Sequence, residues 1–83
     1  MLCNINIHDL VKVVIEIGIG VSEVKENEHA FQIVTTEKAY INLFPSTKKI
    51  TVQGKKKVSG HIERKLFDYL KNRPNGGVAN VQN

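Results

Sequence analysis

The sequence has few of the residues that mark specialised classes of small protein. Cys3 is the only cysteine, so an intrachain disulfide is excluded, and with no sign of export we expect a reducing, cytoplasmic setting. No apolar run reaches the ~18 residues that a membrane span needs, because Lys12 and Glu16 interrupt the longest aliphatic stretch. The N-terminal residues lack the basic and apolar regions of a secretory signal. We therefore expect no membrane association.

Residue patterns for catalysis and for cofactor binding are also missing. His8, His29 and His61 have no cysteine or carboxylate at metal-ligand spacing, so we expect no metal site. Cys3 would need a nearby base to act as a nucleophile; His8 is the one candidate, but a small buried apolar role fits Cys3 better. Residues 18–20 hold two glycines without the third of a phosphate loop. We expect no enzyme activity, no cofactor and no small-molecule substrate.

The chain that remains is one small folded domain with an uneven charge distribution. Its 83 residues suffice for a single core, and we predict an α+β domain over residues 1–73 with a flexible C-terminal tail over residues 74–83. Residues 1–37 have two lysines against six carboxylates, whereas residues 38–83 have ten basic residues against two acidic ones. The basic second part suits a polyanionic partner, although a solvated basic surface would give the same count.

Hydrophobic periodicity predicts the order of the elements. Residues 2–7 alternate loosely, as in a short strand, and residues 8–17 carry a helical apolar stripe with Asp9 or Asn6 as N-cap. Residues 11–21 also keep a period of two, so helix, strand and a mixture of both remain open. Residues 21–28 indicate a loop or an edge strand.

The second half of the chain predicts a hairpin and a helix. Residues 30–35, residues 39–44 and Lys49–Gln53 alternate as three antiparallel strands. A helix then follows over residues 60–73 with Ser59 as its N-cap. Both helices would pack on the apolar sheet face formed by Ile41, Leu43, Ile50 and Val52, and the other face would stay open.

The open face carries polar and aromatic side chains next to lysines. Stacking on Tyr40 and Phe44 is worth ~1–3 kcal/mol per base, and lysines that neutralise phosphates release counterions. We therefore predict a nucleic-acid-binding surface with a single lysine-rich rim at one end of the sheet. The predicted nucleic-acid-binding residues are Tyr40, Asn42, Phe44, Lys48, Lys49, Thr51, Gln53, Lys55, Lys56 and Lys57.

The run from the strand at residues 40–44 through PST and KKITVQGK to the final helix resembles half of a TATA-binding protein. It is similar also to the TATA-binding-protein-like domain at the N-terminus of ribonuclease HIII. The resemblance covers residues 29–72 by sequence and residues 2–20 by element order alone. It implies an antiparallel sheet with two helices on one face, and binding of duplex DNA or an RNA/DNA hybrid through the open face. Phe44 matches the aromatic strand end of that family, and Thr51 and Gln53 match outward residues of its next strand.

The chain departs from the family in having one repeat and one strand-end aromatic where the saddle-shaped protein has two. We therefore expect no sharp kinking of DNA by a monomer, whereas a homodimer would rebuild a two-fold saddle. We predict a non-enzymatic nucleic-acid-binding accessory protein. The alternative is a protein-interaction or inhibitor module, for instance of a mobile element, that uses the same face on a protein partner.

Overall fold

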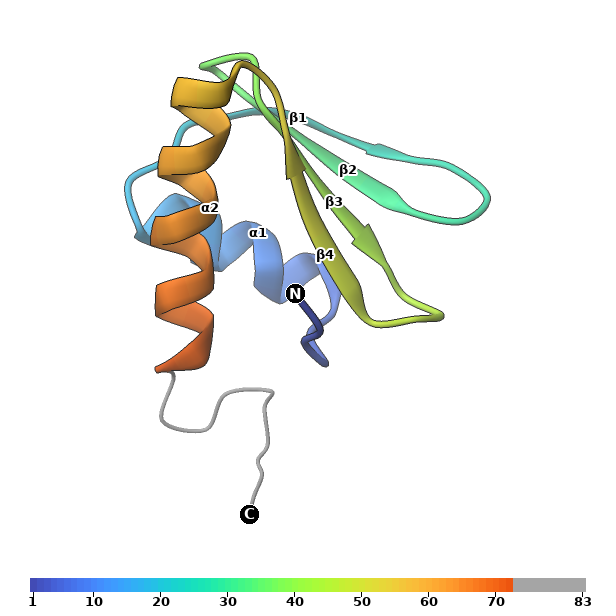
Figure 1. Ribbon diagram of the computed structural model, residues 1–83. Coiled ribbons are helices and arrows are strands. Elements are labelled where there is room, and N and C mark those ends of the chain that lie inside the picture. Colours follow the sequence, from blue (N-terminus) through green and yellow to red (C-terminus); the bar gives the residue numbers. More distant parts are fainter. Residues whose placement is uncertain (73–83) are drawn as a thin grey trace.

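The computed structural model describes residues 1–72, and the predicted tail lies outside them. The elements follow the order α1 (Ile7–Glu16), β1 (Val21–Glu26), β2 (Phe31–Thr35), β3 (Tyr40–Phe44), β4 (Lys49–Gln53) and α2 (Lys56–Lys71). The strands form one antiparallel sheet in the order β1-β2-β3-β4, with both helices on the same side of it (Figure 1). The predicted α+β class with one open sheet face is confirmed, and the strand added to the three predicted antiparallel strands is β1 and not the predicted strand over residues 2–7.

The N-terminal part resolves the ambiguity between helix and strand into one of each. The side chain of Asn6 accepts a hydrogen bond from the Asp9 N–H at 2.8 Å and caps α1, so the predicted cap at Asn6 is confirmed. The chain then turns at Gly18, whose φ of +91° favours glycine, before it enters β1. The predicted strand over residues 2–7 is wrong: Leu2 forms only an isolated bridge with Lys49.

The predicted start of the second helix is also wrong. α2 begins at Lys56, with Lys55 as an N-cap whose side chain makes no capping hydrogen bond. Ser59 lies inside the helix, and its N–H donates to the Lys55 carbonyl at 2.8 Å. Lysine has a good helix propensity, so Lys56 and Lys57 extend the helix toward the strand, with Lys55 as its cap.

The core lies between the two helices and the covered sheet face. α1 contributes Leu10, Val13 and Val14, and α2 contributes Ile62, Leu66 and Leu70. Three of the four sheet residues predicted for the core are buried, namely Ile41, Leu43 and Ile50, and the fourth, Val52, is half-buried. Ile33 of β2 is buried beside them. Within residues 1–72 no helix is long and apolar enough to cross a lipid bilayer.

Candidate nucleic-acid interface

The six strand residues predicted to bind nucleic acid form three facing pairs on the open side of the sheet. The pairs are Tyr40 with Gln53, Asn42 with Thr51, and Phe44 with Lys49. Directly opposite residues in an antiparallel sheet project to the same side, so the alternation in the sequence placed all six on one face. The Ile41–Val52 and Leu43–Ile50 pairs between them point to the core.

Asn42 is the centre of a hydrogen-bonded network on this face. Its Oδ1 accepts from Gln32 Nε2 at 3.1 Å, and its Nδ2 donates to Thr51 Oγ1 at 3.2 Å and to Gln53 Oε1 at 2.8 Å. Only 7% of Asn42 is exposed. Both donors of its amide are in use, so Asn42 supports the surface and leaves contact with a partner to its more exposed neighbours.

Gln32 was not among the predicted site residues. It faces Asn42 on one side and Lys25 of β1 on the other, so the open face extends across all four strands. The alternation of residues 30–35 puts Gln32 and Val34 on the side opposite Phe31 and Ile33. The contact of Gln32 with Asn42 depends on the register between β2 and β3, which the sequence pattern of one strand does not specify.

The two aromatic side chains of the face differ in exposure. Tyr40 is 36% exposed, and Phe44 is half-buried. Tyr40 lies beside the half-buried Val34 of β2, so one part of the face is apolar. Tyr40 is thus the more accessible aromatic group for stacking.

The lysines form two groups instead of the single rim that the sequence predicted. Lys48 and Lys49 lie at the start of β4, whereas Lys55, Lys56 and Lys57 lie beyond its other end, at the start of α2. At ~3.3 Å per residue, β4 separates the two groups by at least ~13 Å. Lys38 lies near the second group, because its carbonyl oxygen is 3.4 Å from the position that a Cβ on Gly54 would take.

Within residues 1–72, no ion pair neutralises the charges of these lysines. Over residues 1–72, the ion pairs are Lys25–Glu23 and His29–Glu28, and neither includes a lysine of the two groups. The first turn of α2 also lacks an acidic residue. The positive end of the helix dipole therefore adds to the potential of the second lysine group.

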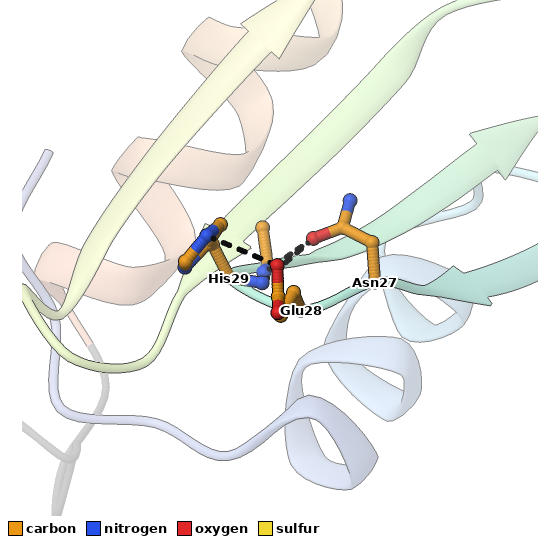
Figure 2. Close-up of polar contacts among 4 residues, drawn as sticks. Asn27, Glu28 and His29 are labelled. Atoms are coloured by element: carbon orange, nitrogen blue, oxygen red, sulfur yellow. Dashed lines mark hydrogen bonds and ion pairs between the residues drawn. The ribbon is translucent and has the colours of Figure 1, made fainter.

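The turn between β1 and β2 is built by a short polar segment. Asn27 Oδ1 accepts from the N–H groups of His29 and Ala30, and His29 Nε2 lies 3.5 Å from Glu28 Oε1 (Figure 2). An open hollow of about 340 Å³ separates this turn from Pro45 and Ser46 of the β3–β4 turn. No group of three His, Cys, Asp or Glu side chains in the described part of the chain could hold a metal ion.

The geometry defines a class of protein: a small α+β domain whose antiparallel sheet is covered by helices on one face only. Comparison with protein-family models, with curated proteins and with solved structures found no match for the chain.

Proposed function

We propose that this domain is a non-enzymatic accessory protein that binds duplex nucleic acid, DNA or an RNA/DNA hybrid, on the open face of its sheet. The observation that carries the proposal is the placement of Tyr40 and Gln53, on the open face, between two lysine groups. The distance between the two lysine groups is comparable to the width of a duplex groove, and the major groove of B-DNA is ~12 Å wide. The lysines would contact phosphates on either side while the sheet faces the groove between them.

The remaining support comes from the pre-organised polar centre and from the sequence. The network around Asn42 fixes Thr51 and Gln53 in place, so less side-chain entropy is lost when a partner binds. The resemblance of residues 29–72 to the TATA-binding-protein family points to the same face. Neither consideration specifies a nucleotide sequence, so we expect binding governed by shape and charge.

The first prediction is a salt-dependent titration that responds to lysines of the face and not to lysines elsewhere. Labelled DNA, RNA and hybrid duplexes are titrated with protein at about 50 mM and about 200 mM salt, a range over which phosphate-driven binding weakens steeply. The triple variant Lys55→Gln, Lys56→Gln, Lys57→Gln should reduce the affinity at low salt about tenfold or more and lower the salt slope by about two to three, since each lost phosphate contact removes ~0.9.

The matched control removes the same number of charges away from the face. Lys12→Gln, Lys65→Gln and Lys71→Gln change side chains on α1 and α2, and the net charge falls from +4 by the same amount in both variants. We expect the control to bind nearly as well as the wild type. Equal losses in the two variants would mean general charge attraction, and a flat titration of folded wild-type protein would refute the function.

A protein partner on the same face is the second candidate. The observation that favours it is the apolar pair of the exposed Tyr40 and the half-buried Val34 at one end of the face, with the half-buried Phe44 at the other end of β3. Aromatic side chains of this kind are enriched in protein interfaces. Binding that persists at high salt and is lost on Tyr40→Ala, with no response to the lysine variants, would favour this candidate.

A further inference from the structure

The sheet has one edge that is partly covered and one that is open within residues 1–72. At β4, the Cys3 N–H donates to the Lys48 carbonyl at 2.8 Å, and the Ile50 N–H donates to the Met1 carbonyl at 2.7 Å. The N-terminal segment therefore pairs with the beginning of β4 and occupies that part of the edge. At the other end of the strand order lies β1, which has β2 as its single neighbour.

The backbone groups that face the free edge can be assigned from the hairpin turn. The Asn27 N–H donates to the Ala30 carbonyl at 2.9 Å, so it points toward β2. Successive residues of a strand direct their backbone groups to opposite edges, and the register is regular from Val24 to Glu26. The N–H and C=O groups of Val24 and Glu26 therefore point outward, where they can pair with another strand.

The side chains of β1 make this edge complementary to itself. In an antiparallel pair of two β1 strands centred on Val24, each Val24 faces the other Val24, and each Glu23 faces the Lys25 of the other copy. Glu23 and Lys25 lie on the open face, opposite Val34 and Gln32. Within one chain they form an exposed ion pair, with Lys25 Nζ 4.0 Å from Glu23 Oε2. Both would thus gain a partner of opposite charge directly across the new strand pair.

Val24 adds an apolar contact on the other side of the sheet. It faces the buried Ile33, yet it is 44% exposed. In Figure 1 the β1–β2 hairpin extends beyond the two helices that pack on this face of the sheet. A second Val24 would cover this apolar surface at the centre of the pair.

We propose that β1 is a self-association edge, which pairs antiparallel with β1 of a second copy of this chain about a two-fold axis through Val24. Two-fold symmetry requires that a contact from position 23 to position 25 be repeated from 25 to 23, and this strand meets the requirement. The result is one continuous sheet with both open faces on the same side and the two β4 edges at its outer ends. An interface of one strand per copy is small, so the association is weak and depends on concentration.

The second prediction tests the association by exchanging the charges of the pair. Sedimentation velocity from about 10 μM to about 1 mM, the range expected for a small interface, should show a concentration-dependent dimer. Glu23→Lys alone or Lys25→Glu alone places like charges opposite each other at two positions and should weaken the dimer about tenfold. The double variant E23K/K25E should restore it.

Mixing the two single variants separates association from folding. A chain with Glu23→Lys has lysine at both positions, and a chain with Lys25→Glu has glutamate at both. In a mixed pair each lysine faces a glutamate, so the mixture should associate more tightly than either variant alone. Glu37→Lys is the matched control, since it makes the same charge change on the exposed β2–β3 turn, beyond the Val21 end of β1 and outside the proposed pairing of positions 23 and 25. A wild-type protein that stays monomeric to about 1 mM, or a mixture that associates no better than its components, would overturn the proposal. If the wild type stays monomeric, the charges of β1 and the bulge between Val21 and Glu23 prevent this edge from pairing with another strand.

Discussion

At the scale of single residues, two glycines in the second half of the chain have opposite roles. Gly54 ends β4 with φ of +141°, and a Cβ there would lie 3.1 Å from the Ala39 Cα. Gly60 lies in α2, and a Cβ there would meet nothing within 4 Å. The first glycine is required by the backbone, whereas the second only weakens its helix.

The third prediction is that alanine at these two positions changes stability in opposite directions. Gly54→Ala should lower the free energy of unfolding by about 1–3 kcal/mol, because the conformation is strained for an L-residue and the neighbour is backbone. Gly60→Ala should raise it by about 0.5–1 kcal/mol. Urea denaturation followed by circular dichroism measures both. Similar effects of the two substitutions would contradict the close approach of Gly54 to Ala39.

Residue patterns predicted which side chains share a face but not how deeply each is buried. The period of two in β3 separated Ile41 and Leu43 from Tyr40 and Asn42 because it follows from the backbone alone. The burial of Asn42 depends on Gln32 and Gln53, which reach it from neighbouring strands. Such contacts depend on the register between strands and on the lengths of the side chains that reach across, and the pattern of one strand does not specify the register.

At the scale of elements, the start of α2 shows a competition between capping and propensity. Ser59 has the residue type of an N-cap, but the lysines before it continue the helix back to Lys56. Lys55 has the extended backbone of a cap, with φ of −59° and ψ of 138°, and no side-chain acceptor. The residue type typical of an N-cap occurs at Ser59, which is not the cap. The residue type alone does not show that the helix propensity of the lysines before Ser59 moves the start of the helix upstream.

The fourth prediction is a trade-off between stability and binding at this position. Lys55→Asp supplies an acceptor and a negative charge at the helix N-terminus, so the free energy of unfolding should rise by about 0.5–1.5 kcal/mol. The same change removes a lysine of the proposed interface, so the affinity for duplex nucleic acid should fall. Denaturation and titration of the same sample measure both effects.

Ser59→Ala is the matched control for the cap. It should change the free energy of unfolding by less than about 0.5 kcal/mol, because it replaces one helix-interior residue with a better helix former. A loss of about 1 kcal/mol on Ser59→Ala, with no gain on Lys55→Asp, would restore Ser59 as the cap.

At the scale of the whole molecule, the two edges of the sheet are in different states. One is held by the N-terminal segment, and the other ends at β1. The sequence predicted three antiparallel strands and a further strand over residues 2–7, and it left residues 21–28 open between a loop and an edge strand, because the polar, acidic side chains of β1 hide its alternation. It also predicted one lysine rim, because residues close in sequence were taken as close in space, whereas a strand separates them.

The fifth prediction concerns amide hydrogen exchange at the two edges. The amides of Cys3 and Ile50 should be protected because each donates to a backbone carbonyl. The amides of Val24 and Glu26 should exchange quickly in dilute protein, since they point to the free edge. Exchange followed by NMR gives each rate, and slow exchange of Val24 in dilute protein would contradict the orientation of β1.

The pairing of residues 1–3 with β4 has a chemical consequence. The Cys3 side chain is only 4% exposed and lies in the core cluster, and its amide is bound to Lys48. A thiol reagent can reach the sulfur only when this segment leaves the sheet. The rate of alkylation of this cysteine therefore measures how often the N-terminal segment separates from β4, and no substitution is needed. Comparison of that rate with global unfolding shows how much of the domain's stability this segment shares.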